Sequence, residues 1–257
     1  MEKINKDKDR CRLRKYLGKT VTMIVDRPIG YDHDGLVYPV NYGYLPGVMA
    51  ADGEEQDVYL LGVQEPVTRF TGRIVAIVHR EDDIEDKLVM VPEGMRLFRH
   101  EIENRVRFQE QFFRSKVEAI WEKSCGGLVF RQKGGDIEYL CLMQKASGIY
   151  SAPKGHMEGE ETEEETARRE ILEEAGLRVQ LLPDFREKLV YAPFPGKKKE
   201  LILFLARGEG TLSLQAEEIL SASWLPLKEA LTVLHSDYAP VLEKAEAYLR
   251  QRPYLLS

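Results

Sequence analysis

The stretch GHMEGEETEEETARREILEEAGL, residues 155–177, decides how the second half of the chain folds. It contains no proline, and its three glycines stand near its two ends. Residues 162–175 consist of good or acceptable helix formers, and Gly176 follows where a left-handed residue commonly ends a helix. We therefore expect a helix over residues 162–175, preceded by a glycine-containing loop.

Three glutamates of this expected helix share one face. Glu170, Glu173 and Glu174 are spaced i, i+3 and i+4, which places their carboxylates side by side. Crowded carboxylates repel each other unless a cation compensates them, and such hard oxygen ligands suit Mg²⁺, with Mn²⁺ as the alternative. Ile171 and Leu172 lie on other faces and are expected to pack the helix onto a sheet. The glutamate face is therefore a candidate metal site.

The same stretch resembles the Nudix box, G-x5-E-x7-R-E-U-x-E-E-x-G-U, where U is an aliphatic residue, and every specified position is filled. The resemblance implies a hydrolase that cleaves a phosphoanhydride bond with a metal-activated water. The metal ligands that it implies are the carbonyl of Gly155 and the side chains of Glu170, Glu173 and Glu174. Arg169 would orient a carboxylate of the box. The general base is left open between Glu170 and the distant Glu218.

Residues outside the box indicate a nucleoside polyphosphate substrate. The segment YSAPKGHME, residues 150–158, resembles the W-x-x-P-K-G-H-x-E segment of the asymmetric diadenosine tetraphosphate hydrolases, with tyrosine in place of tryptophan. The stretch at 185–199 is similar to the aromatic and basic stretch of that subfamily. Lysines offer cations to phosphate oxygens, and an aromatic ring can stack on a base. The candidate substrate-binding residues are Tyr150, Lys154, His156, Tyr191, Lys198 and Lys199.

This resemblance implies cleavage of diadenosine tetraphosphate to ATP and AMP. Three alternatives remain open. The chain could be a bifunctional nucleotide pyrophosphohydrolase and inorganic pyrophosphatase, an RNA 5′-end pyrophosphohydrolase, or a nucleotide-binding protein without catalysis. Nucleic acid is a partner only if an RNA 5′ end is the substrate.

The first half of the chain reads as strands and turns followed by a helix. Apolar, β-branched runs at 20–26, 57–61 and 72–79 predict strands, and residues 38–47 are rich in turn formers and tyrosines. Apolar residues recur at helical spacing over 95–121, which predicts one long amphipathic helix. In the second half we expect strands at 124–130, 139–143, 201–206 and 222–225, and helices at 226–234 and 240–250.

YPVNYGYLPG at 38–47 and DGEEQDV at 52–58 resemble the Y-P-x-N-Y-G-Y and D-G-D-P-x-D-V motifs of the soluble inorganic pyrophosphatases. Residues 82–89, DDIEDKLV, resemble an acidic segment of that family that ends in lysine. The positions that carry over as a vestigial metal and phosphate site are Tyr42, Asp52, Glu54, Asp57, Glu85 and Lys87, with glutamate replacing aspartate at 54 and 85. Gly30 stands where the family has a phosphate-binding lysine, and the loop for its arginine is missing. We therefore expect weak metal binding and poor catalysis here.

The two resemblances predict an α+β chain of two domains. Residues 1–118 would form a small β-barrel-like, pyrophosphatase-like domain with a long helix, and residues 119–257 a Nudix α/β/α sandwich. With 257 residues and 43% hydrophobic content, the chain is long enough for both.

Composition indicates a cytoplasmic protein. No apolar run is long enough to cross a bilayer, three cysteines lack metal-ligand spacing, and the net charge is −6. We expect no membrane partner and a small-molecule substrate, and leave the oligomeric state open, with a homodimer as one option. The basic first fifteen residues are expected to be a frayed, solvated terminus.

Overall fold

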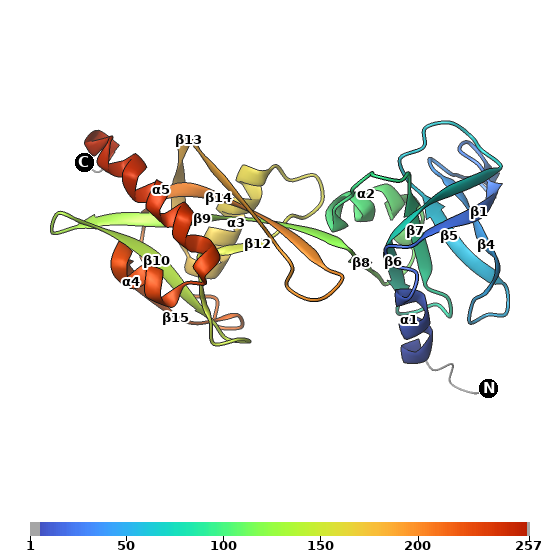
Figure 1. The fold of residues 1–257 in the computed structure, drawn as a ribbon, viewed down its shortest axis with the longest axis horizontal. Coiled ribbons are helices and arrows are strands. Elements are labelled where there is room, and N and C mark those ends of the chain that lie inside the picture. The colour runs from blue at the N-terminus through green and yellow to red at the C-terminus, as the bar shows by residue number, and fades with distance from the viewer. Residues whose placement is uncertain (1–5, 256–257) are drawn as a thin grey trace. The chain divides into compact units, whose positions relative to one another are not determined.

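The computed structural model describes residues 6–255, with side chains from residue 10 onward. The chain forms two compact units (Figure 1). The first unit comprises the residues up to Glu122 together with Ala192–Lys198, and the second comprises Lys123–Tyr191 together with the residues from Lys199. Strands dominate both units and helices are few, so the predicted α+β class is confirmed. None of the helices in residues 6–255 is both long enough and apolar enough to span a membrane.

The first unit contains a closed five-stranded barrel. Its strand order is β1-β4-β5-β7-β6, and β6 pairs again with β1 to close the ring, while β8 extends the sheet from β6. The strands are β1 (Thr20–Arg27), β4 (Asn41–Met49), β5 (Glu55–Leu60), β6 (Arg69–Arg80), β7 (Lys87–Val91) and β8 (Ser115–Ala119). A short hairpin of β2 (Asp32–His33) and β3 (Leu36–Val37) follows β1. The expected barrel is confirmed.

Two apolar clusters stabilise this unit. One cluster fills the barrel with side chains from all five strands, among them Met23, Val58 and Leu88. The other lies beneath helix α2 (Arg99–Glu110), which contributes Ile102 and Val106. Successive strand residues point to opposite faces, so a strand such as β7 supplies both clusters.

The expectation of one long helix over 95–121 is wrong. Helix α2 ends at Glu110, and residues 115–119 form β8, which pairs antiparallel with β6 from Ala76 to Arg80. Spacing alone does not distinguish these alternatives, because the free edge of β6 offers backbone hydrogen bonds that only the folded chain reveals. Residues 38–47, expected as turns, lie largely in β4, where Pro46 falls at an irregularity of the pairing with β5.

The chain start is also more ordered than expected. Residues 6–14 form helix α1 (Lys6–Arg14), and the side chain of Leu13 is fully buried. Arg14 forms an ion pair with Glu118 of β8 at 3.0 Å. The prediction of a solvated terminus is therefore wrong for this helix, and residues 1–5 lie outside the described part.

The second unit is built on a sheet of order β11-β10-β9-β14-β13, with β12 paired to β9 and β15 paired to β10. Its strands are β9 (Trp121–Lys133), β10 (Asp136–Gln144), β11 (Tyr150–Ser151), β12 (Lys154–His156), β13 (Arg178–Tyr191), β14 (Lys198–Glu209) and β15 (Ile219–Pro226). Each strand predicted in this half lies within an observed one. Strand β13 was not predicted.

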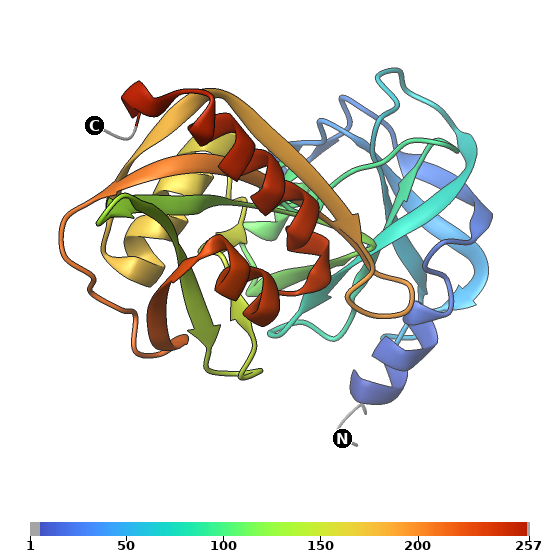
Figure 2. The ribbon, with the colours of Figure 1, turned by 60° about the vertical axis from the view of Figure 1, so that its left-hand side comes forward.

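Helices cover both faces of this sheet (Figure 2). Val129 of β9 packs with Ile171 of helix α3 (Glu163–Ala175), whereas the next residue, Phe130, packs with Leu242 of α5 (Ala239–Arg250). Helix α4 (Leu227–Val233) joins α5, and two 3-10 turns, η1 (Ser236–Tyr238) and η2 (Pro253–Leu255), flank α5. The predicted sandwich is confirmed. Leu172, expected to pack on the sheet, is instead 47% exposed.

Candidate functional site

Both ends of α3 are fixed by local contacts. Thr162 Oγ1 accepts a hydrogen bond from Glu165 N at 3.2 Å, and the Glu165 carboxylate accepts one from Thr162 N at 2.8 Å, so each satisfies a free group of the first turn. Gly176 ends the helix with φ 71°, a conformation that glycine adopts without strain. These signals are local, and for this reason the sequence predicted the helix almost to the residue.

One guanidinium organises the acidic face of α3. Arg169 donates to both carboxylate oxygens of Glu161, at 2.7 and 2.9 Å, and to Glu170 Oε1 at 2.8 Å. It also donates to Glu173 Oε2 at 3.1 Å and to the carbonyl oxygen of His156 at 2.9 Å. A paired contact of this kind fixes the orientation of a carboxylate as well as its charge. The arginine thus ties the loop before α3 to two of the three glutamates.

Gly155 lies directly against the Glu170 carboxylate. A Cβ at Gly155 would stand 2.0 Å from the carboxyl carbon and from both oxygens of Glu170, so only glycine allows this approach. Burial raises the pKa of Glu170, hydrogen bonding to Arg169 opposes the rise, and the charge of Glu173 adds to it. The backbone of Gly155 and the carboxylate of Glu170 are therefore in close contact at this point of the box.

Glu174 is the most deeply buried of the three glutamates, with 3% exposure. Its Oε2 accepts a hydrogen bond from Lys154 N at 3.0 Å, and the side chain of Gln144 also hydrogen-bonds to it. Burial raises the pKa of Glu174 to about 7, because the charge of Lys154 and these donors do not offset the lost hydration, and the charge of Glu170 adds to the rise. A cation nearby would stabilise the ionised form.

The chemistry of these residues fits a divalent cation. Arg169 is shared among Glu161, Glu170 and Glu173, so the negative charge of the face is only partly compensated. Hard oxygen donors of this kind match Mg²⁺. Among the described side chains, no three acidic, histidine or cysteine residues form a preassembled metal cluster. The candidate ligands are Gly155, Glu170, Glu173 and Glu174.

The six candidate substrate residues separate into groups. Lys199 Nζ lies 3.4 Å from His156 Nε2, and the backbone of Lys154 contacts Glu174, so these three side chains belong to the second unit near α3. Tyr150 and Tyr191 are half-buried and pack against the apolar core. Lys198 belongs to the first unit, with its Nζ 5.2 Å from the centroid of the Trp121 ring.

Glu218 is exposed, in the segment before β15. Its backbone contacts Lys145 and Gln215, and Gln215 N donates to Glu174 O at 3.3 Å. In the described part of the chain, no hydrogen bond joins the Glu218 carboxylate to the glutamates of α3. The segment thus reaches the end of α3 through its backbone and through Leu212 and Leu214, which pack against the cluster that contains Ala175.

Sequence reasoning missed two side chains next to Glu174. Gln144 bonds to Glu174 and donates to Ser151 Oγ at 3.0 Å. Tyr238 is buried, hydrogen-bonds to the backbone of Ala152, and has a pKa raised by burial and by the nearby charges of Tyr191 and Glu174. No local signal marks either residue, because each lies far from the box in sequence.

In the first unit, four of the six carried-over residues converge. Tyr42 Oη and Lys87 Nζ each donate to Asp57 Oδ2 at 2.6 Å, and Lys87 also forms an ion pair with Glu85. Glu85 Oε1 accepts from Gln56 Nε2 and from Asp57 N, both at 3.0 Å. Each carboxylate of the cluster therefore already contacts a cation from the protein itself.

Asp52 and Glu54 form no hydrogen bond with this cluster in the described residues. They stand in the exposed turn between β4 and β5, where Asp52 Oδ1 accepts from Glu54 N at 2.9 Å. Within residues 6–255, neither side chain bonds to the cluster. Arg27, which sequence reasoning missed, lies beside it, with its guanidinium carbon 5.5 Å from the centroid of the Tyr42 ring and its Nη1 donating to Tyr38 Oη at 2.8 Å. In the sequence, the only sign that Arg27 lies near this cluster is its position at the end of β1.

Comparisons with known proteins match the two halves of the chain to two different families. Residues 122–245 match the family model described as NUDIX domain, and residues 3–121 match the one described as inorganic pyrophosphatase. The asymmetrical bis(5′-nucleosyl)-tetraphosphatase of Sus scrofa is 33% identical over 144 residues, which are 49% of this chain and 95% of that protein. The protein of the same name from Caenorhabditis elegans is 31% identical over 49% of this chain and 96% of its own length. A crystal structure of a C. elegans Ap4A hydrolase binary complex is 28% identical, covers 51% of this chain and 98% of that one, and has a TM-score of 0.48.

The chain belongs to the Nudix family, whose members are hydrolases that cleave phosphoanhydride bonds. Its first half is a pyrophosphatase-like domain. Both families generally depend on divalent metal ions.

Proposed function

We propose that this protein is a Mg²⁺-dependent hydrolase of dinucleoside polyphosphates that cleaves diadenosine tetraphosphate to ATP and AMP. The observation that carries the proposal is the acidic face of α3, where Glu170 and Glu173 share the guanidinium of Arg169 and the buried Glu174 lies on the same face. The tetraphosphatases that the chain resembles over nearly their full length support this choice of substrate.

In this proposal the box residues hold the ion. Glu173, Glu174, Glu170 and the Gly155 carbonyl would be its ligands, and a bound Mg²⁺ would neutralise phosphate charge and acidify the attacking water. Arg169 holds Glu170 and Glu173 in position through the bonds described above. Lys154, His156 and Lys199 would face the phosphate oxygens that the ion does not cover.

In the reaction, the oxygen of a water molecule attacks phosphorus and the P–O anhydride bond breaks. A general base must accept a proton from this water. Glu170 is the first candidate, because it lies beside Gly155 and its burial makes it a better base than an exposed carboxylate. Glu218 is the second candidate. Glu170→Gln and Glu218→Gln, compared at saturating Mg²⁺, distinguish them, since loss of the base lowers kcat and removes the acidic limb of the pH profile.

Product analysis tests the substrate. Diadenosine tetraphosphate incubated with the protein and Mg²⁺ should give equal amounts of ATP and AMP by ion-exchange chromatography. Two ADP would contradict the cleavage position. No cleavage, beside rapid turnover of a mononucleotide or of triphosphorylated RNA, would contradict the substrate class.

For the first half, we propose a scaffold without pyrophosphatase activity, with residues 1–118 and 119–257 acting as separate domains. The support is the cluster around Lys87, whose ammonium already forms ion pairs with Asp57 and Glu85. A carboxylate whose charge is compensated by a protein cation attracts a metal ion less strongly.

A further inference from the structure

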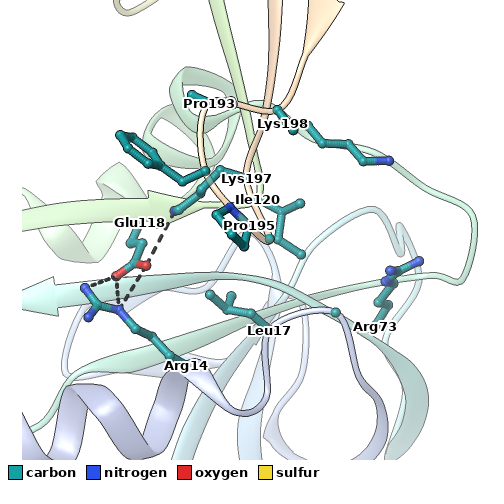
Figure 3. Close-up of a pocket in the computed structure, with 13 residues that line it drawn as sticks. Arg14, Leu17, Arg73, Glu118, Ile120, Pro193, Pro195, Lys197 and Lys198 are labelled. Atoms are coloured by element: carbon teal, nitrogen blue, oxygen red, sulfur yellow. Dashed lines mark hydrogen bonds and ion pairs between the residues drawn. The ribbon is translucent and has the colours of Figure 1, made fainter.

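A cavity of about 920 Å³ opens in the first unit (Figure 3). Its wall is formed by the end of α1 and the residues after it, by β6 and β8, and by the segment Ala192–Lys198. This size is typical of sites for small organic ligands.

Four cations and one carboxylate line this cavity. Glu118 contacts two of the cations, Arg14 at 3.0 Å and Lys197 at 3.5 Å. Burial alone would raise the pKa of Glu118, but hydrogen bonds from Arg14 and His79 outweigh it and lower the pKa to about 2. The single carboxylate is therefore fully engaged and leaves an excess of positive charge.

The other two cations, Arg73 and Lys198, lie on the opposite side of the cavity from Glu118 (Figure 3). Arg73 has one loose ion pair, 3.7 Å from the exposed Glu93, and such exposed pairs contribute little. The ammonium of Lys198 lies over the Trp121 ring. In the described residues, neither cation is neutralised by a buried carboxylate.

Between these charges the wall is apolar. Leu17, Ile120 and Pro195 lie between the two sets of cations (Figure 3). The ring of Phe194, which also lines the cavity, is 71% exposed. A flat aromatic group would cover this ring and the prolines beside it, and would remove apolar surface from water.

We propose that this cavity binds a nucleoside phosphate, with the phosphate between Arg73 and Lys198 and the base against Phe194. No residue of the box lines this cavity, so the site requires none of the box glutamates. A guanidinium and an ammonium together match the charge of a diphosphate.

The test uses the full chain in excess chelator, so that no hydrolysis accompanies binding, and follows tryptophan fluorescence during titration with ADP. Trp121 lies beneath Lys198, whereas Trp224, the other of the two tryptophans, belongs to the second unit. We expect a saturable change that Trp121→Phe abolishes, with the affinity of that variant unchanged by calorimetry.

Arg73→Gln and Lys198→Gln should each weaken ADP binding about tenfold or more, because each removes a charge-assisted hydrogen bond. Arg114→Gln is the matched control, since its side chain is 76% exposed and outside the cavity, and it should bind ADP as the unchanged protein does. Phe194→Ala should weaken ADP but not inorganic pyrophosphate.

Three results would overturn the proposal. The first is no saturable signal, or equal ADP affinity in Arg73→Gln and Arg114→Gln. The second is pyrophosphate binding as tightly as ADP, which would make the cavity a site for inorganic phosphate groups only. The third is adenosine binding as tightly as ADP, which would exclude the phosphate clamp. None of these results bears on hydrolysis at the box, because the assay contains no free metal ion.

Discussion

Each half of this chain gathers carboxylates, but the two halves compensate them differently. In the first unit, the partly exposed Asp57 and the buried Glu85 share the ammonium of Lys87, which is itself buried. In the second unit, Arg169 is divided among Glu161, Glu170 and Glu173, and the buried Glu174 accepts hydrogen bonds from the backbone of Lys154 and from Gln144 instead of pairing with Arg169. The number of acidic residues alone therefore does not make a cation site. What matters is how much of their charge the protein itself leaves uncompensated.

The largest expected effect concerns the compensated cluster. Lys87→Met leaves the carboxylates of Asp57 and Glu85 together without a cation, and breaking a buried pair from one side typically costs about 3–5 kcal/mol. We expect a loss of this size in the free energy of unfolding by urea at neutral pH. Lys116→Met, which removes an exposed pair with Glu81, should leave the free energy of unfolding nearly unchanged, because exposed pairs contribute little. Equal effects would show that the cluster is not buried as described.

The second prediction concerns the uncompensated face. Glu173→Gln or Glu174→Gln should lower kcat at least about 10²-fold while folding is retained, because charge stabilisation by a metal ion is worth several kcal/mol. Turnover of diadenosine tetraphosphate measures the loss. The control is Glu164→Gln on the same helix, where the exposed glutamate pairs with Arg168 at 3.1 Å and activity should stay unchanged. Full activity in excess chelator, or in both variants, would refute the metal site.

The third prediction contrasts two glutamates by pH. Glu118 has a folded pKa of about 2, below its ordinary 4.5, so its ionised form stabilises the fold above pH 4.5 and this contribution is lost as the pH falls towards 2. Glu174 has a folded pKa of about 7, above its ordinary 4.5. Its ionised form therefore destabilises the metal-free fold increasingly as the pH rises from 4.5 through 7.

Urea unfolding in chelator should reveal opposite signs. At pH 8, Glu118→Gln should lower the free energy of unfolding and Glu174→Gln should raise it, each by up to about 2 kcal/mol. Near pH 4.5 the gain from Glu174→Gln should vanish, and towards pH 3 the loss from Glu118→Gln should shrink. Changes of the same sign at pH 8 would contradict the comparison.

The last prediction is that the first unit hydrolyses inorganic pyrophosphate negligibly. In the full chain carrying Glu173→Gln and Glu174→Gln, release of phosphate from inorganic pyrophosphate should stay far below an ordinary turnover of about 10 s⁻¹. Lys87 occupies the carboxylates, Gly30 supplies no cation, and each lost electrostatic contact typically costs about 10²–10³ in rate. Asp57→Asn should change nothing. Turnover above that level, abolished by Asp57→Asn, would favour the bifunctional enzyme.

The predictable parts of the molecule are those whose signals are local. Helix α3 carries its own cap at Thr162 and its own stop at Gly176, and the i, i+3, i+4 spacing of the glutamates follows from helix geometry. The convergence of Tyr42, Asp57 and Lys87 could be expected only from the resemblance, since the three lie on separate strands. The helix expected over 95–121 failed because its second part could also form a strand, and β6 offered the partner.

The box could be inferred from local sequence: its helix, its shared acidic face, its glycine and arginine, and the family to which the chain belongs. Tertiary structure alone decided the environment of each charge. It buried Glu174 beside Gln144 and paired Asp57 with Lys87. It also separated two neighbouring lysines, so that Lys198 lines a cavity of the first unit while Lys199 contacts His156. The physical reason is that a helix face depends on residues three or four apart, whereas burial and charge compensation depend on groups that are distant in sequence until the chain folds.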